Sequence, residues 1–383
     1  MTGRCTAHGA MTRHEIDGHL LTPAGFLRGR LRATDGRIDT IDGEPVTEAE
    51  VRADATRPIV LPGFVDLHVH GGGGADTMDA GAAATQLART HARHGTTALL
   101  ATTMTAPLAD IEAALHALRP HCERRPAGGA RVLGVHLEGP YISARHLGAQ
   151  PDFVRAPTLA EILALHAIAP IRVLTLAPEA DGALALIPAL VDAGVRVQIG
   201  HSAADYEQAR QALACGASGF THLFNAMGAL HHRAPGVVGA ALAHGERAEI
   251  IPDLLHVHPA AIRAALRALP GLYCVTDATA ATGMPDGDYR LGRQAVRKCR
   301  DAVRLADGTL AGSTLTMDQA LRNLVLHLGL SLAEASARVS TLAARYLGEH
   351  DRGALEVGAH ADLVVLDASS LQLQQVIVEG EAL

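Results

Sequence analysis

Two histidines spaced two residues apart, His68 and His70, are the first residues of this sequence that could bind a metal ion. They follow an apolar stretch that begins at Leu61, and such a stretch indicates a β-strand. Side chains at positions i and i+2 of a strand project from the same face, so both imidazoles can reach one ion. The pair alone is weak support for a metal site, because histidine is often only a hydrogen-bonding residue.

Further residues with metal-binding or acid–base side chains lie where other predicted strands end. Neutral imidazoles together with carboxylates suit Zn²⁺ or another first-row divalent ion. Because such residues recur at the ends of five of the eight predicted strands, the sequence predicts one shared metal centre. The additional residues are Glu138, His201, His222 and Asp277.

The elements that must position these residues follow a repeating pattern. Apolar runs alternate with segments of helical character, which favours an α/β fold whose parallel sheet closes into a (β/α)8 TIM-like barrel. Catalytic groups in such barrels come from the C-terminal ends of the strands. The predicted strands are 61–68, 96–102, 131–136, 171–176, 195–199, 219–223, 249–251 and 272–276. The predicted helices are 81–94, 108–121, 158–168, 182–193, 203–214, 259–269, 314–328 and 331–347.

Both chain ends have a β-rich pattern instead. Short strand-like pieces and turns fill residues 14–60, and residues 353–383 contain two more strand-like runs. Neither end alone has enough strands to bury a core, so we expect them to combine in one small β-sandwich domain. The predicted domains are therefore 1–60 with 353–383 for the β domain, and 61–352 for the barrel.

The composition excludes several classes of protein. With 48% hydrophobic and 19% charged residues, the 383-residue chain can bury a large core. A net charge of −7 and the absence of tryptophan argue against nucleic-acid binding. No apolar run is long enough to span a bilayer, and the first residues lack the apolar core of a signal peptide. We therefore expect a cytoplasmic protein that binds neither nucleic acid nor membrane, and its five scattered cysteines suit a reducing compartment.

Several stretches, read together, resemble one family: the N-acetylglucosamine-6-phosphate deacetylases of the amidohydrolase superfamily. They span residues 61 to about 325, and the segment GALEVGAHADLVVLD near the end of the chain is similar to the closing β segment of the superfamily. The matching stretches are LPGFVDLHVHGGGG, HLEGPYIS, GHSAADYEQA, THLFNAM, RAPGVVGAAL, VTDATAATGMPDGDYRLG and GTLAGSTLTMDQALRNL.

The resemblance implies a metal site. Three residues match the principal metal ligands of the family, and the first-strand histidine pair matches a position where some members hold a second ion. The implied cofactor is Zn²⁺, with Fe²⁺, Mn²⁺ or Co²⁺ as alternatives, at one or two ions per subunit. The implied ligands are Glu138, His201 and His222, with His68 and His70 for the second ion.

The resemblance also implies a reaction, the hydrolysis of N-acetyl-D-glucosamine 6-phosphate to D-glucosamine 6-phosphate and acetate. A metal-bound hydroxide would attack the acetyl carbonyl, with Asp277 as general base and then general acid. The resemblance further implies a homodimer whose neighbouring subunit approaches the phosphate site. The residues at substrate-binding positions are Asn225, Ala226, Arg233, His256 and Gln150.

Two positions depart from the family pattern. Leu254 stands where many members have glycine, and Gln150 stands where many have histidine. Gln150 can still donate a hydrogen bond to a sugar hydroxyl or to the acetyl oxygen. Because both changes leave the sugar open, N-acetyl-D-galactosamine 6-phosphate is an alternative substrate. A nucleobase deaminase is less well supported, since neither His201 nor His222 begins an H-x-x-E motif. A non-enzymatic phosphosugar sensor would not need to keep every candidate ligand.

Other polar residues near the predicted strands are expected to be structural. His136 should pack inside the barrel, although it faces the same way as Glu138 and could orient a metal ligand. Ser202 should cap the helix that follows it, and His91 should face solvent. The only lysine, Lys298, lies after the eighth strand, so a carboxylated lysine cannot bridge two ions and any bridging carboxylate must be Glu138.

Overall fold

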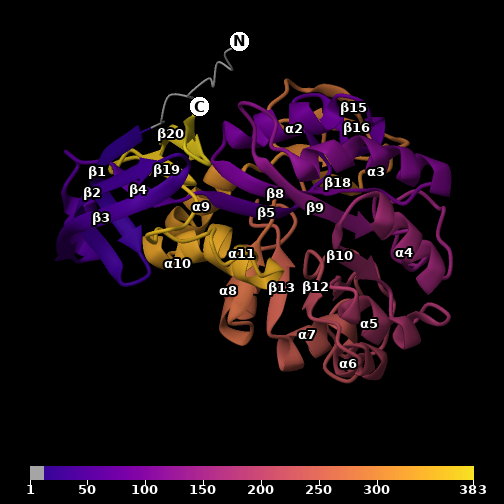
Figure 1. The fold of residues 1–383 in the computed structure, drawn as a ribbon. Helices are drawn as coiled ribbons and strands as arrows, with labels where there is room; N and C mark the ends of the chain where they lie inside the picture. The colour runs from indigo at the N-terminus through magenta and orange to yellow at the C-terminus, as the bar shows by residue number, and fades with distance from the viewer. Residues whose placement is uncertain (1–12) are drawn as a thin grey trace, which may run out of the picture.

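A computed structural model describes residues 13–383 of the protein. Residues 1–12, which include Cys5 and begin the predicted β domain, lie outside the described part. The described chain consists of a (β/α)8 barrel and a separate β-rich part built from both chain ends, as the sequence predicts (Figure 1).

Eight parallel strands form the barrel. Six are hydrogen-bonded as one sheet and the last two pair with each other. The ring closes through the backbone: Leu223 N–H donates to Glu249 O (2.9 Å), and Asp277 N–H donates to His68 O (2.9 Å). The strands are β5 (Phe64–Val69), β8 (Thr96–Thr102), β9 (Arg131–Glu138), β10 (Ile171–Leu176), β11 (Arg196–Ile199), β12 (Gly219–Phe220), β13 (Arg247–Ile250) and β14 (Gly271–Cys274).

A helix follows each of the first seven barrel strands. One of them, α7, has no counterpart among the predicted helices, because its sequence GVVGAALAH contains two glycines and is buried over most of its length, which hides the helical period. The seven helices are α2 (Ala83–Ala92), α3 (Leu108–Glu123), α4 (Leu159–Ile168), α5 (Ala183–Asp192), α6 (Tyr206–Ala214), α7 (Gly236–His244) and α8 (Pro259–Ala268).

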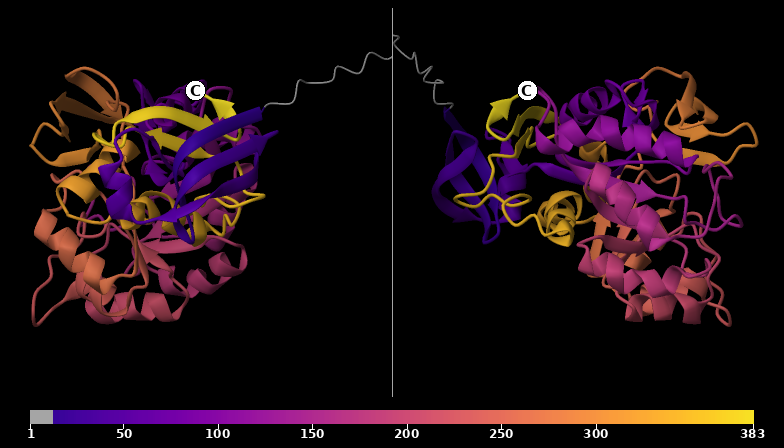
Figure 2. Two further views of the ribbon diagram at one scale, coloured as in Figure 1. Left: turned by 90° about the vertical axis from the view of Figure 1, so that its left-hand side faces the viewer. Right: turned by 45° about the vertical axis from the view of Figure 1, so that its right-hand side comes forward.

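A four-stranded antiparallel sheet is inserted after β14, where the sequence analysis predicted no element. The insert lies on the far side of the molecule from the β-rich part (Figures 1 and 2). After β5, the short strands β6 (Gly71–Gly72) and β7 (Ala75–Asp76) pair with each other; Asp76 accepts a hydrogen bond from Gly292 N–H (3.0 Å), which ties the first turn of the insert to the barrel mouth. Its strands are β15 (Gly287–Leu291), β16 (Gln294–Cys299), β17 (Ala302–Arg304) and β18 (Leu310–Ser313).

The remaining helices close the barrel after the insert. They are α9 (Met317–Leu326), α10 (Leu332–Ser336), a π-helical turn (Ala337–Thr341) and α11 (Leu342–Leu347). In residues 13–383, no helix combines the length and the apolar character needed to cross a membrane. The four cysteines of the described chain are free thiols.

The two chain ends share one seven-stranded sheet (Figure 2, indigo and yellow). Its core is a cluster of buried aliphatic side chains contributed by both ends, including Leu20, Leu31 and Ile377. The helix α1 (Glu48–Ala53) lies between its third and fourth strands in the chain. In spatial order the strands are β21 (Glu381–Ala382), β20 (Leu373–Val378), β19 (Leu363–Leu366), β4 (Ile59–Pro62), β1 (Arg13–Thr22), β2 (Gly25–Thr34) and β3 (Arg37–Val46).

The predicted strand 61–68 is divided at Gly63. Its first part, Leu61 and Pro62, belongs to β4 and pairs with β19 in the end sheet, whereas its second part is β5 of the barrel. A β-carbon at Gly63 would lie 2.3 Å from the side chain of Thr97, so only glycine fits where the chain passes from one sheet to the other.

An ion cluster joins the barrel to the end sheet. Glu379 of the end sheet accepts hydrogen bonds from Arg131 at the start of β9 (2.8 Å and 2.9 Å) and from Arg125 (3.2 Å), and it also pairs with Arg352. Arg352 in turn pairs with Asp362. Because all but Arg131 have side chains at most 15% exposed, these pairs are shielded from water.

Candidate metal centre

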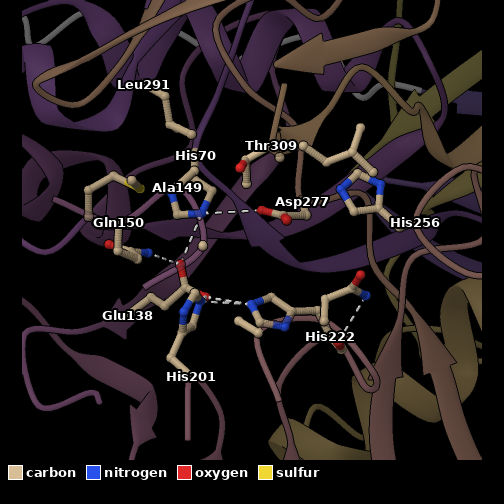
Figure 3. A pocket seen from close by; sticks show the side chains of 16 residues that line it. His70, Glu138, Ala149, Gln150, His201, His222, His256, Asp277, Leu291 and Thr309 are labelled. Carbon is tan, nitrogen blue, oxygen red and sulfur yellow. Dashed lines mark hydrogen bonds and ion pairs between the residues drawn. The ribbon is translucent and has the colours of Figure 1, made fainter. Parts of the chain in front are cut away.

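Three side chains at the ends of three barrel strands meet around one carboxylate oxygen (Figure 3). Glu138 Oε1 lies 3.1 Å from His201 Nε2 and 3.0 Å from His222 Nε2. The two imidazole nitrogens are themselves 3.0 Å apart. All three side chains are buried, so the structure brings together the three residues that the sequence predicts as principal metal ligands.

The first-strand histidines adjoin this group from the other side. His70 Nε2 lies 3.2 Å from Glu138 Oε2 and 3.2 Å from Asp277 Oδ1. His68 Nε2 lies 3.2 Å from His70 Nε2, 3.4 Å from Asp277 Oδ1 and 3.5 Å from Glu138 Oε1. Glu138 therefore lies between the two histidine pairs: its Oε1 faces His201, His222 and His68, and its Oε2 faces His70.

Three of these side chains belong to residues with a strained backbone conformation. His201, His222 and Asp277 have positive φ angles of 46°, 30° and 52°, a region that residues with a β-carbon rarely adopt. Each lies just past the end of its strand, where the chain turns sharply outward. Strained non-glycine residues cluster at functional sites, where the surrounding structure fixes their conformation.

The hydrogen bonds on the outer side of the imidazoles test whether a metal would fit. His201 Nδ1 donates to the carbonyl oxygen of His146 (2.9 Å), and His68 Nδ1 donates to Glu249 Oε2 (3.0 Å). In the neutral imidazoles the Nε2 atoms therefore carry lone pairs, and these face the carboxylate oxygens of Glu138 and Asp277. Lone pairs facing one another at this spacing need a cation between them, so the donor set fits a divalent ion of the first transition row.

The ionisation of the two carboxylates, Asp277 and Glu138, is consistent with a cation site. Burial alone would raise the pKa of Asp277, but the imidazoles of His68 and His70 outweigh it and hold that pKa at about 2. Burial also opposes ionisation of Glu138, yet His68 and His201 hold its pKa well below the ordinary value. The carboxylates are thus ionised at neutral pH, and protons and a metal ion compete for the same imidazole lone pairs.

The metal centre forms the floor of a cavity of about 200 Å³. One side of the cavity has an apolar wall, formed by Met104, Ala149 and Leu291, and Leu291 comes from the insert (Figure 3). The turn between β17 and β18 contributes Thr309, so the inserted sheet also shapes the entrance. A small molecule in this cavity would touch the candidate metal-binding carboxylates at one end and an apolar surface beside them.

Four of the five predicted substrate-binding residues line the same cavity. Asn225 and Ala226 follow His222, and the Asn225 side chain donates to the carbonyl oxygen of His222 (3.1 Å). His256 lines the cavity, with its Nδ1 2.6 Å from Asp253, which raises the pKa of the imidazole against the effect of burial. Gln150 also lines it and donates to Glu138 Oε2 (2.6 Å).

Arg233 is the exception among the predicted substrate-binding residues. It is exposed, does not line the cavity, and lies within hydrogen-bonding distance of its neighbour His232 (Nη1 to Nε2, 2.8 Å). Its role in binding substrate remains a prediction.

Two buried carboxylates near the metal centre were not among the predicted site residues. Glu249 on β13 contacts His68, as described above. Asp66 accepts hydrogen bonds from the Thr276 hydroxyl (2.6 Å) and from its N–H (3.2 Å), and joins the ends of β5 and β14. Burial raises the pKa of Asp66 to about 7. A charged residue inside an apolar strand run was the signal that could have identified both.

Two of the structural roles expected from the sequence are wrong. Ser202 does not cap the following helix, which begins after Asp205; its hydroxyl donates to Glu179 (2.7 Å). His91 is buried rather than exposed, because its Nε2 donates to the carbonyl oxygen of Gly71 (2.8 Å) in the loop beside the metal centre. His136 packs inside the barrel, as expected, with Nδ1 3.1 Å from the carbonyl oxygen of Leu67.

A family model and known relatives both match nearly the whole chain. The model of the Amidohydrolase family matches residues 59–383. The chain is 43% identical over 371 residues to an N-acetylgalactosamine-6-phosphate deacetylase of Escherichia coli O157:H7, covering 94% of this chain and 97% of that protein. It is 39% identical over 353 residues to the N-acetylglucosamine-6-phosphate deacetylase of Bacillus subtilis, covering 89% of each.

Solved structures show the same likeness. A mutant N-acetyl-D-glucosamine-6-phosphate deacetylase of Mycobacterium smegmatis, in complex with N-acetyl-D-glucosamine-6-phosphate, superposes with a TM-score of 0.88 at 36% identity. The match covers 98% of this chain and 99% of that one. The chain therefore belongs to the amidohydrolase family, and its resemblance to the N-acetylglucosamine-6-phosphate deacetylases of that family extends over nearly its whole length.

Proposed function

We propose that this protein is a metal-dependent deacetylase that converts N-acetyl-D-glucosamine 6-phosphate to D-glucosamine 6-phosphate and acetate. The observation that carries the proposal is the convergence of Glu138, His201 and His222 on one point, with Asp277 beside them at the floor of a cavity. The relatives named N-acetylglucosamine-6-phosphate deacetylase match nearly the whole chain, and this likeness supports the same reaction here.

The chain's own residues divide the chemistry between them. Glu138, His201 and His222 would hold a divalent ion, which would supply a Lewis acid for the acetyl carbonyl and would lower the pKa of a water molecule. Asp277 is ionised and 8% exposed at the cavity floor, so its carboxylate can take a proton from that water. The same group then returns the proton to the departing amine, because the cavity contains no other ionised carboxylate except Glu138, a metal ligand.

The polar and apolar lining of the cavity favours one orientation of the substrate. Asn225, Ala226 and His256 lie on one side, where amide, backbone and imidazole N–H groups can hold a sugar phosphate. On the other side, Met104 and Leu291 leave an apolar surface for the acetyl methyl group. The amide bond would then lie between these two regions, over Glu138 and Asp277.

Zinc is the proposed metal, because the site offers nitrogen and carboxylate ligands in a buried setting. Fe²⁺, Mn²⁺ and Co²⁺ use the same ligand types, so the identity is decided by measurement. Metal analysis of the purified protein, followed by removal with EDTA and restoration with each ion, tests this part of the proposal. Full activity after exhaustive metal removal would contradict it.

The 4-epimer, N-acetyl-D-galactosamine 6-phosphate, is the second candidate substrate. It is supported by the 43% identity to a protein named for that sugar and by the departures at Gln150 and Leu254. Acetate release should be measured with both phosphosugars in parallel, as kcat/KM. We expect the glucosamine derivative to be preferred. Equal or higher kcat/KM with the galactosamine derivative would replace the proposed substrate, and no release from either would contradict the deacetylase function.

We also propose that the protein is a cytoplasmic homodimer. Arg233 and Leu230 are exposed on the segment after β12, and Leu255 is exposed after β13, so the loops that follow these two barrel strands offer an arginine and apolar side chains to a second subunit. Light scattering of the purified chain tests the dimer. If Arg233 acts across the interface, mixing inactive Arg233→Ala and Asp277→Asn chains should restore part of the activity.

A further inference from the structure

A fully buried carboxylate, Glu249, lies behind the metal centre on β13 and takes no part in the chemistry described above. Its Oε2 is 3.0 Å from His68 Nδ1 and accepts the backbone N–H of His222 (3.2 Å). Its Oε1 accepts the hydroxyl of Tyr273 (3.3 Å). Glu249 therefore contacts the outer side of one candidate ligand and the backbone of another.

The contact with Glu249 decides which nitrogen of His68 is free. A carboxylate can only accept, so Nδ1 carries the proton and Nε2 keeps its lone pair. That lone pair points at the space bounded by His70 Nε2 (3.2 Å), Asp277 Oδ1 (3.4 Å) and Glu138 Oε1 (3.5 Å). The other tautomer would put a hydrogen where a metal ion needs a ligand atom.

The carboxylate of Glu249 is itself held in place by polar side chains inside the barrel. Gln198 donates to the hydroxyl of Tyr273 (2.7 Å), and Thr221 donates to the other end of the Gln198 amide (2.9 Å). Thr175 lies 2.7 Å from both Thr221 Oγ1 and His136 Nε2. This chain of contacts, which crosses the barrel below the metal centre, restricts rotation of the Glu249 side chain.

Only His68 has such a partner among the four candidate ligand histidines. His201 uses a backbone carbonyl, and the Nδ1 atoms of His70 and His222 have no hydrogen-bond partner within the described residues. Hydrogen bonds from a ligand imidazole to a carboxylate fix its tautomer and orientation and increase its basicity. The structure therefore provides such a carboxylate partner for one histidine of the first-strand pair, and for neither histidine among the three principal ligands.

We propose that Glu249 is a positioning residue for a second metal ion, which it favours by holding His68 with Nε2 directed at the space between His70 and Asp277. The proposal concerns metal binding and does not require that the substrate be an acetylated sugar phosphate. Its experiment therefore measures bound ions and protons and makes no use of acetate release.

The first test compares zinc binding by the wild type, Glu249→Gln and Tyr273→Phe chains after removal of metal. Glutamine keeps the shape of Glu249 but removes its charge, and its amide can present N–H to His68. We expect two zinc ions per wild-type chain, and about 10–100-fold weaker binding of the second ion in Glu249→Gln. The first ion should remain within about threefold of wild type. In Tyr273→Phe, which keeps the carboxylate but removes one hydrogen bond to it, the second ion should be weakened less than in Glu249→Gln, and the first ion should stay within that range.

Two outcomes of this titration would overturn the proposal. One is a wild-type chain that takes up a single zinc ion. The other is a Glu249→Gln chain that binds the second ion as tightly as the wild type does. Circular dichroism of each metal-free variant shows whether the fold is kept.

A measurement on the wild type covers the case in which Glu249→Gln does not fold. In the zinc-loaded protein labelled with ¹⁵N-histidine, His68 should show a hydrogen-bonded proton on Nδ1, and His68→Gln should remove this signal. Absence of such a proton on His68 would also overturn the proposal.

Discussion

Gln150 donates an amide N–H to Glu138 Oε2 over 2.6 Å, so one oxygen of this carboxylate is fixed by the protein itself. The opposite end of the same amide accepts the backbone N–H of Thr105 (2.7 Å). Both polar ends of the Gln150 side chain are thus engaged inside the protein, and it is only 4% exposed. We infer that Gln150 orients Glu138 toward His201 and His222, in addition to any contact with the sugar.

Gln150→Met tests this role, because methionine has a similar size but neither donates nor accepts strongly. We expect metal affinity to fall about 10-fold through the loss of orientation of Glu138, with KM changed less than about threefold. Zinc titration and steady-state kinetics at saturating metal check the two parts. Gln375→Met, at an exposed position of β20, is the matched control. A raised KM with unchanged metal affinity would assign Gln150 to sugar binding alone.

Asp277→Asn tests the proton transfer. Asparagine cannot accept the proton of the attacking water, so kcat should fall about 10²–10⁴-fold. The ion held by Glu138, His201 and His222 should remain, because none of these residues changes. Metal analysis and acetate release on the same sample check both parts, with Asp301→Asn on the exposed part of the insert as control. Turnover near the wild-type value would refute the role of Asp277.

The barrel and the arrangement of the site could be predicted because both follow from local patterns. Each candidate ligand lies next to an apolar run, and the ends of parallel barrel strands must meet at one mouth. His68, Glu138 and His222 are therefore neighbours in space although the chain between them is long. Gln150 was also identified, but its partner was not, since sequence spacing says nothing about which oxygen of Glu138 it contacts.

The features that could not be predicted depend on contacts across the fold. Glu249 is one charged residue in a short strand, and only the closed barrel shows that it reaches His68. The insert 287–313 is rich in arginine and aspartate, so its alternating pattern resembles a solvated loop. The division of the first strand at Gly63 depends on Thr97 packing against the glycine from another strand.

The ion cluster between the barrel and the end sheet should make stability depend on pH. Burial would raise the pKa of Glu379, but Arg131 and Arg352 hold it at about 2, below the ordinary value of 4.5. A carboxyl whose pKa is lowered on folding stabilises the folded state above its unfolded pKa, and this contribution is lost as the pH falls toward the folded pKa. The contribution of Glu379 should therefore be complete above pH about 5.5 and decline between about 4.5 and 2.

Glu379→Gln measures that contribution. We expect the variant to be less stable than the wild type by about 1–3 kcal/mol at pH 7, with the difference shrinking by pH 3. Urea unfolding of both chains in EDTA keeps metal release out of the comparison. Glu356→Gln, at an exposed position before β19, is the control. A difference that stays constant from pH 7 to pH 3 would show that Glu379 does not act through its charge.

The apolar wall beside the metal centre should limit the size of the acyl group. Leu291 is 2% exposed and lines the cavity opposite the proposed phosphate side, with Met104 next to it. One methylene group in a closed apolar pocket changes discrimination by about 10–200-fold. We expect Leu291→Ala to raise kcat/KM for the N-butyryl substrate relative to the N-acetyl substrate by about 10-fold or more, because the truncated side chain leaves room for the longer chain. Leu326→Ala, at an exposed leucine of α9 outside the cavity, should leave the ratio unchanged. If the ratio in Leu291→Ala also equals that of the wild type, the acyl group lies elsewhere in the cavity, and the direction proposed for the substrate is wrong.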